Sequence, residues 1–121
     1  MGYKVILRRP PVSVIEFVAY RRRADELLTT AEQDAVIDLI AYDPTCGDLI
    51  PGTGGLRKVR VGRGGSGKRG GARVIYYFYS ADFPLLLLGL YGKNEKSDLS
   101  DREKKRLVDA VKEITGPWRR R

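Results

Sequence analysis

The sequence predicts a single α+β domain, an antiparallel sheet with helices packed on one of its faces. Segments rich in β-branched and aromatic residues alternate with segments whose apolar residues recur at helical spacing. Two capping boxes mark expected helix starts. The 121 residues are 42% hydrophobic, which is enough for one core but not for two. The expected order is one strand, two helices, three strands in a meander and one helix.

The first half of the chain supplies the first strand and two helices. Residues 12–17 favour a short strand, in which Val12, Val14 and Glu16 would alternate with Ser13, Ile15 and Phe17. From Tyr20 the apolar residues follow helical spacing instead. Thr30 is expected to begin the second helix, with Gln33 completing its capping box. Asp43-Pro44 should end that helix, because the residue before proline disfavours helical backbone.

The second half supplies the meander and the last helix. The expected strands are 56–61, 73–79 and 85–91. A turn-rich segment at 47–55 precedes them, and a glycine-rich, basic hairpin loop at 62–71 and a turn at 82–84 separate them. The third of these strands is apolar throughout, as is typical of a strand covered on both faces. Ser100 and Glu103 form the second capping box, and Gly116-Pro117 should stop the helix that it opens.

These elements give the expected domain bounds. Residues 1–11 are interpreted as a basic leader, 12–115 as the folded domain, and 116–121 as a basic tail that holds Trp118 and three arginines.

The charge balance favours a polyanionic partner. Lys and Arg number 23 against 15 Asp and Glu, giving a net charge of +8 and a pI near 9.8. Clustered cations bind phosphates and release counterions, so nucleic acid is the first partner to consider. The alternative is a basic domain whose charge serves solubility alone.

The residue types that are missing exclude several functions. The chain has no histidine, and Cys46 is its only cysteine. It can therefore form no internal disulfide, which suits a reducing compartment, and it lacks the ligands for a structural zinc site. No metal or other cofactor is expected. No stretch resembles a signal peptide, and the longest apolar run, Leu85 to Leu90, is far shorter than the ~20 residues of a membrane helix. We expect a cytoplasmic protein.

The glycine-rich loop does not predict a nucleotide site. Gly62 to Lys68 nearly matches a P-loop, but Arg69 stands where Ser or Thr must bind magnesium. A strand rather than a helix is expected next, so no helix N-terminus would face the phosphates. The loop is better interpreted as a cationic hairpin tip.

The cations on the expected strands are more informative. Lys58 and Arg60 are two residues apart, so their side chains should share one face while Val59 points to the other. The set expected to converge with them on one groove comprises Arg73, Tyr91, Lys93 and, above it, Lys68. A phosphodiester is the natural occupant of such a cluster. A solvated sheet face would carry similar residues, and the pattern alone does not separate the two readings.

Three blocks of the sequence are informative together, namely 52–60 (GTGGLRKVR), 67–77 (GKRGGARVIYY) and 91–95 (YGKNE). They resemble the HigB-like branch of the RelE/ParE toxin superfamily. The likeness covers roughly Val14 to Ile114 and is more specific than any single motif, since the blocks keep their order and spacing.

The resemblance implies a RelE-like fold and a type II toxin–antitoxin role. Nucleases of this family cleave messenger RNA in the ribosomal A site without a metal, and a cognate antitoxin, here expected to be a HigA-like DNA-binding protein, inhibits them. It places Lys58, Arg60 and Arg73 in the catalytic positions. Lys93 is a further catalytic candidate, and the candidate contacts to RNA are Arg57, Lys68, Arg69, Tyr91 and Lys96. Two positions depart from RelE: Asn94 replaces an arginine, and Ser100 replaces an RNA-orienting tyrosine.

The expected reaction is attack of the RNA 2′-hydroxyl on the adjacent phosphate. Either Lys58 or Arg60 is the candidate base, and arginine, which stays protonated, suits stabilisation of the pentavalent state better. Two alternatives stay open. One is a non-nucleolytic toxin of the same fold, such as a ParE-like gyrase poison, and the other is an RNA-binding module that stacks bases on the aromatic run 76–79. The oligomeric state is left open.

Overall fold

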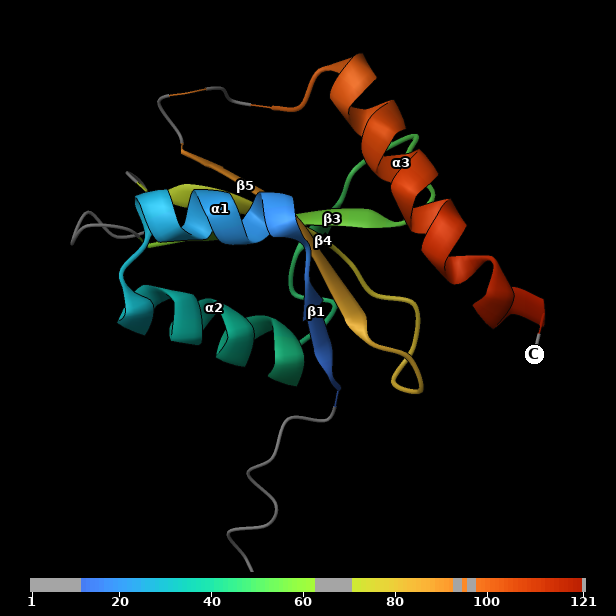
Figure 1. The fold of residues 1–121 in the computed structure, drawn as a ribbon, viewed down its shortest axis with the longest axis horizontal. Coiled ribbons are helices and arrows are strands. Elements are labelled where there is room, and N and C mark those ends of the chain that lie inside the picture. Colours follow the sequence, from blue (N-terminus) through green and yellow to red (C-terminus); the bar gives the residue numbers. More distant parts are fainter. Residues whose placement is uncertain (1–11, 63–70, 93–94, 96–97, 121) are drawn as a thin grey trace, which may run out of the picture.

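The computed structural model describes residues 12–62, 71–92, 95 and 98–120, and it confirms the α+β class (Figure 1). The elements in chain order are β1 Val14–Glu16, α1 Val18–Leu27, α2 Thr30–Tyr42, β2 Asp48–Leu49, β3 Leu56–Val61, β4 Ala72–Tyr77, β5 Leu85–Gly92, α3 Asp101–Thr115 and a 3₁₀ helix, η2 Pro117–Arg120. The predicted leader, at 1–11, lies outside the described residues.

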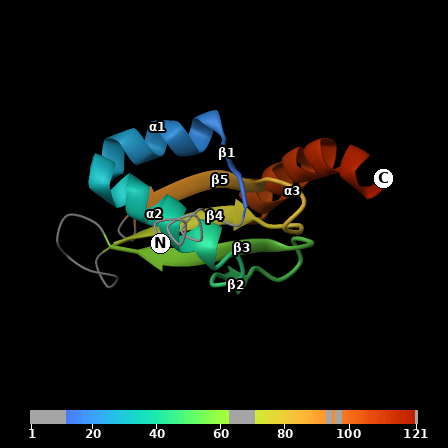
Figure 2. The same cartoon turned by 90° about the horizontal axis from the view of Figure 1, so that it is seen from below.

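The sheet has five strands in the order β1-β5-β4-β3-β2, which Figure 2 shows edge-on. Strands β3, β4 and β5 form the antiparallel meander that the sequence predicts. The prediction of a wholly antiparallel sheet is wrong at one edge, where β1 pairs parallel with β5. Since β3 and β5 both run antiparallel to β4, β1 and β3 run in the same direction, and α1 and α2 lie in the connection between them.

Helices cover both faces of the sheet, which corrects the expectation that they pack on one. Side chains from alternate positions of β4 belong to two separate cores. Val74 and Tyr76 pack with α1 and α2, whereas Ile75 and Tyr77 pack with α3. Because successive strand residues point to opposite faces, two apolar faces require two covering layers. We call the second face, over which α3 lies, the α3 face.

A bulge in β5 determines which residues reach the α3 face. Ile75 pairs with Gly89 but Tyr76 pairs with Leu87, so Leu88 is an extra residue. Because of the extra residue, side chains after the bulge point to the opposite face from the one that strict alternation along β5 would give them. As a result Tyr91 lies on the α3 face, opposite Arg73 of β4.

Side-chain caps explain where the helices begin. The predicted box of Ser100 and Glu103 is present at α3, with both reciprocal hydrogen bonds. At α2 the box lies one residue earlier than predicted, on Thr29 and Glu32. The sequence Thr-Thr-Ala-Glu-Gln satisfies the motif in both registers, and the earlier one places an acidic residue in the first turn, where the helix dipole favours it. Helix α2 ends at Tyr42, before Asp43-Pro44, as predicted.

Two elements were not predicted. The short edge strand β2 pairs with β3 inside the segment expected to be a turn. Residues 117–120, which belong to the segment expected to be a basic tail, form η2. The Trp118 ring stacks on Phe83 at 4.7 Å between centroids. Among the described residues, no helix is both long and apolar enough to cross a membrane.

Candidate functional site

Three predicted cations share the uncovered part of the α3 face. Arg60 pairs directly with Arg73 across β3 and β4, and Lys58 pairs with Ile75, a member of the α3-side core. Val59 packs into the opposite core, as the alternation predicts. We call Lys58, Arg60 and Arg73 the cationic cluster.

The Arg60–Arg73 pair is electrostatically unfavourable in the isolated protein. Directly paired side chains in an antiparallel sheet have Cβ atoms about 4.5–5.5 Å apart, and like charges in such a pair are destabilising. Among the described residues, neither arginine has an ion-pair partner. Arg60 is exposed and Arg73 is half-buried, so both charges are accessible to a ligand. An anion bound between them would relieve the repulsion.

Lys58 has a partner that the sequence did not reveal. Its Nζ lies 3.6 Å from Oδ1 of Asp98, in the segment between β5 and α3. The same oxygen accepts a hydrogen bond from the Leu99 N–H at 2.8 Å. That hydrogen bond, followed by the Lys58 charge, holds the pKa of Asp98 below its usual value. The cluster therefore includes a carboxylate, which comes from a residue 40 positions after Lys58 in the chain.

Tyr91 lies beside the cluster but is mostly buried. Its ring belongs to the α3-side core and is only 4% exposed, so it presents little surface on which a base could stack. Burial raises the pKa of its hydroxyl, with a smaller contribution from the Asp98 charge. Its position next to Arg73 and Asp98 gives it a role in shaping the site rather than an open contact surface.

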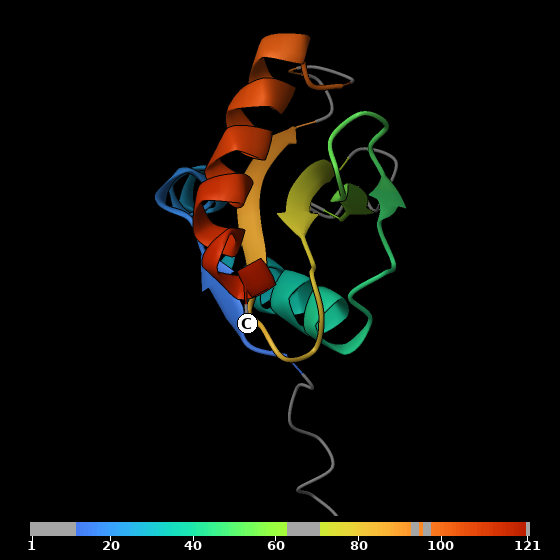
Figure 3. The ribbon, with the colours of Figure 1, turned by 90° about the vertical axis from the view of Figure 1, so that its right-hand side faces the viewer.

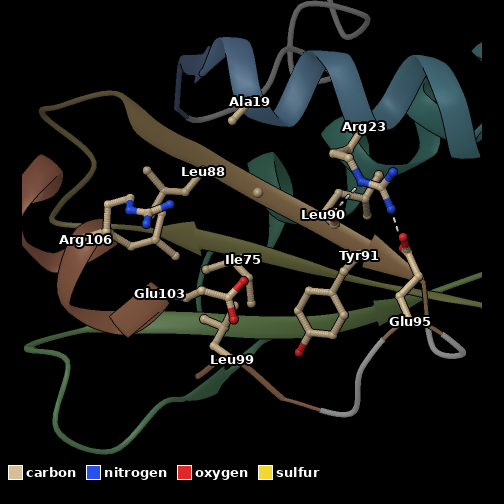
Figure 4. Close-up of a pocket in the computed structure, with 12 residues that line it drawn as sticks. Ala19, Arg23, Ile75, Leu88, Leu90, Tyr91, Glu95, Leu99, Glu103 and Arg106 are labelled. Carbon is tan, nitrogen blue, oxygen red and sulfur yellow. Dashed lines mark hydrogen bonds and ion pairs between the residues drawn. The ribbon is translucent and has the colours of Figure 1, made fainter. Parts of the chain in front are cut away.

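A cavity of about 340 Å³, lined by both apolar and charged side chains, borders Tyr91 (Figure 4). Its walls come from α1, β5 and α3, and Arg23 and Glu95 form an ion pair at its edge. Glu95 also accepts a hydrogen bond from the Gly92 N–H at 2.6 Å. These contacts connect the segment after β5 to α1, and they fix the end of the strand that carries Tyr91.

The remaining predicted residues do not join the cluster in the described structure. Arg57 lies on the opposite face of β3, as strand alternation requires. Its guanidinium donates to the backbone carbonyls of Gly47, at 2.7 Å, and Thr45, at 3.2 Å, so it supports a loop. The other predicted residues, Lys68, Arg69, Lys93 and Lys96, lie outside the described residues.

The aromatic run 76–79 is mostly structural. Tyr76 is fully buried, and its hydroxyl donates to the Pro44 carbonyl and accepts from the Gly47 N–H, both at 2.8 Å. Tyr77 is 4% exposed, and Tyr79 is the most exposed of the four at 37%. These tyrosines therefore do not form a base-stacking platform like that of a single-strand RNA-binding module. In the described part of the chain, no group of three or more His, Cys, Asp or Glu side chains could hold a metal ion.

A comparison with protein families agrees with this fold. Residues 20–117 match the family described as the RelE toxin of the RelE/RelB toxin–antitoxin system. The chain belongs to this family. The match begins in α1 and continues into η2, so it includes every strand of the meander and the whole cationic cluster.

Family membership makes this RelE-family protein the toxin component of a toxin–antitoxin system. It also implies a cognate antitoxin as the partner. The match does not distinguish the HigB-like branch within the superfamily.

Proposed function

We propose that this RelE-family toxin is a ribosome-dependent endoribonuclease of the HigB-like kind, which cleaves messenger RNA in the A site and so inhibits translation. The directly paired Arg60 and Arg73, neither of which forms an ion pair with a described residue, carry the proposal. Such a pair destabilises the free protein, and a scissile phosphate would turn that repulsion into attraction.

The proposed reaction is an internal transfer. A base takes the proton of the 2′-hydroxyl, the 2′-oxygen attacks the adjacent phosphorus, and the bond from phosphorus to the 5′-oxygen breaks. The 5′-oxygen takes up a proton from water as it leaves. Lys58 is the proposed base, and Arg60 and Arg73 stabilise the charge that develops on the pentavalent phosphorus, because arginine keeps its proton. Neither the removal of the 2′-hydroxyl proton nor the attack on phosphorus needs a metal in this proposal. The upstream fragment should end in a 2′,3′-cyclic phosphate or its hydrolysed form. Cleavage should also persist in the presence of EDTA, after correction for the effect of EDTA on the magnesium that the ribosome itself needs.

In the proposed reaction, the substrate phosphate displaces the Asp98 carboxylate from Lys58. In the free protein its Oδ1 lies 3.6 Å from the Nζ of Lys58. A phosphate in the cluster would compete with that carboxylate for the lysine. Substrate binding would thereby separate Lys58 from Asp98 before a proton is transferred.

The test is to replace Lys58, Arg60 and Arg73 with Ala, one at a time, and to measure growth arrest and message cleavage at equal expression. Each variant should lose toxicity, while its melting temperature stays near that of the wild type, because substitutions at accessible positions usually change stability by about 0.5 kcal/mol or less. Arg22, exposed on α1, provides the matched control, and R22A should remain toxic.

The same cultures separate the competing toxin function. Mapping transcript 5′ ends after brief induction detects RNA cleavage, whereas a gyrase poison would cause DNA damage without new ends. If all three variants stay toxic, the site assignment is wrong. If the wild type arrests growth through DNA damage alone, the nuclease proposal is wrong.

For the partner, we propose a HigA-like antitoxin that contributes acidic contacts. Opposite charge speeds encounter with a +8 protein, and like charge slows it.

A further inference from the structure

A second cavity, of about 530 Å³, lies on the same side of the molecule as the cationic cluster but at the other end of β3. It opens between the turn that precedes β3 and the C-terminal half of α3, which face each other in Figure 3. None of the described residues that line this cavity is acidic. The lining residues are Gly52, Thr53, Gly54, Tyr77, Val108, Val111, Lys112, Gly116 and Arg119. Its volume is within the range of sites that bind small ligands.

Arg119 is held in place at this cavity before any ligand binds. Its Nη2 donates to the Tyr77 hydroxyl at 2.8 Å, and its guanidinium lies 5.1 Å from the centre of the Tyr79 ring. These contacts restrict the side chain but use only one of its five N–H donors in a hydrogen bond. A restrained arginine binds an anion with a smaller loss of side-chain entropy than a free one.

Tyr77 and Lys112 add two donors. The Tyr77 hydroxyl accepts from Arg119 and has no acceptor among the described residues for its own proton, although the residue is only 4% exposed. That proton can be donated to a ligand in the cavity. Lys112, one turn before the end of α3, is exposed and forms no ion pair with a described residue.

The turn leaves backbone open to the cavity. Gly52 and Gly54 have φ angles of 77° and 72°, in the left-handed region that glycine tolerates best. A Cβ built on either would meet no atom within 4 Å, so these glycines serve the backbone conformation and not close packing. Without side chains at these positions, a ligand can approach the main chain directly.

We propose that this cavity binds a phosphate group of RNA and anchors the strand whose scissile phosphate lies at the cationic cluster. The proposal rests on the proposed nuclease function, because it assigns the ligand from the same substrate. Strand β3 leads from the turn to the cluster, and four steps of ~3.3 Å separate its first residue, Leu56, from Arg60, a length of about 13 Å. A short single-stranded segment can span that length. Contacts to phosphate set the register of a nucleic acid without reading its sequence.

The test is direct binding by the full chain, measured apart from cleavage. The probes are inorganic phosphate and a short single-stranded RNA that carries 2′-O-methyl groups, which blocks attack by the 2′-oxygen. Amide NMR signals of Gly52 and Gly54 report on the cavity, and those of Lys58 and Arg60 report on the cluster. The variants are K112A and R119Q. The matched control is K105A, which removes an exposed lysine from the same helix outside the cavity.

Both probes should shift the Gly52 and Gly54 signals. K112A should weaken RNA binding about three- to tenfold and lower the slope of log affinity against log salt by about 0.7, the value for one phosphate contact to a single strand. K105A should change neither quantity by a comparable amount. R119Q should weaken RNA binding at least as strongly as K112A does. A thermal melting curve shows whether the R119Q variant stays folded.

Each other outcome overturns the inference. Equal effects of K112A and K105A would mean that general charge, not a site, attracts the RNA. Shifts from phosphate but not from RNA would assign the cavity to a free phosphate compound. Loss of antitoxin affinity with unchanged RNA affinity would assign it to a protein carboxylate. Failure of the proposed nuclease function would instead appear as intact toxicity of the K58A, R60A and R73A variants, with phosphate binding at Gly52 and Gly54 unaffected.

Discussion

At the scale of single residues, the site depends on a few positions that are fixed by backbone contacts. Gly47 is one of these, since a Cβ there would lie 2.9 Å from the Lys58 carbonyl oxygen and 2.9 Å from the Tyr76 ring. The Tyr76 hydroxyl bonds to the same loop, and so does the Arg57 guanidinium. The loop before β2 is thus packed directly against the strand that carries Lys58.

We therefore expect G47A to reduce the free energy of unfolding by about 1–3 kcal/mol, because the added methyl group overpacks the loop against β3. Urea denaturation followed by circular dichroism measures the change. G89A is the matched control, since a Cβ at Gly89 meets no atom within 4 Å and should cause no loss of stability. Equal effects of the two substitutions would show that the contact at Gly47 does not constrain the fold.

Asp98 gives the site a pH dependence with a definite sign. Its pKa is lowered in the folded protein, first by the Leu99 N–H and then by Lys58. A lowered pKa means that the ionised carboxylate stabilises the fold above the unfolded pKa, and that this contribution is lost as the pH falls through the folded pKa.

D98N should accordingly be slightly less stable than the wild type near pH 7, by less than about 1 kcal/mol because the pair is exposed. The difference should vanish when the pH falls well below 3.8, the usual value for this carboxyl group. Thermal melts of both proteins across that range measure it, with D38N, an exposed position on α2, as the control. A difference that persists at the lowest pH would rule out the carboxylate charge as its cause.

The residues of the cluster were predictable only in part. Strand alternation was enough to place Lys58 and Arg60 together and Val59 opposite, and the same rule places Arg57 away from them. Asp98 was not predictable, because its approach to Lys58 depends on the path of a segment between β5 and α3 that carries no periodic pattern. Its role follows from tertiary structure alone.

At the scale of elements, the sequences of β4 and β5 already indicate that both faces of the sheet are covered. The apolar runs of β4 and β5 leave no face for solvent, and such strands need cover on both sides. That observation already argues for helices on two faces, as the structure has them. The edge strand β2 was missed for the opposite reason, since its two residues are exposed and show no burial pattern.

The 3₁₀ helix η2 shows how the end of the described chain completes the α3-side core. Trp118 stacks on Phe83 at 4.7 Å and packs with the residues of that core. W118A should lower the free energy of unfolding by about 2 kcal/mol, less than for a fully buried tryptophan because the ring is half-buried.

Urea denaturation again provides the measurement, and V18A is the control, since Val18 is 72% exposed and its truncation should change stability little. A loss for W118A no larger than that for V18A would mean that η2 is only loosely attached to the domain.

At the scale of the whole molecule, the chain has a surplus of cations and poor equipment for proton transfer. It contains no histidine, and a self-sufficient ribonuclease needs a base, an acid and a means of bringing RNA into in-line geometry. Correct positioning of reactants is worth up to roughly 7–11 kcal/mol. A ribosome that presents messenger RNA in the A site in a fixed conformation can supply this positioning, and a +8 protein can dock among the phosphates of ribosomal RNA.

We therefore expect rapid cleavage of translated messages and little or no cleavage of the same RNA free in solution. The measurement compares one transcript, incubated with purified protein, in the presence and absence of programmed ribosomes. R60A serves as the control in both tubes, because it removes one arginine of the pair on which the proposed reaction depends and should abolish any specific cleavage. Equal rates with and without ribosomes would show that the cationic cluster positions RNA by itself, and the lack of histidine would then have to be compensated within the chain.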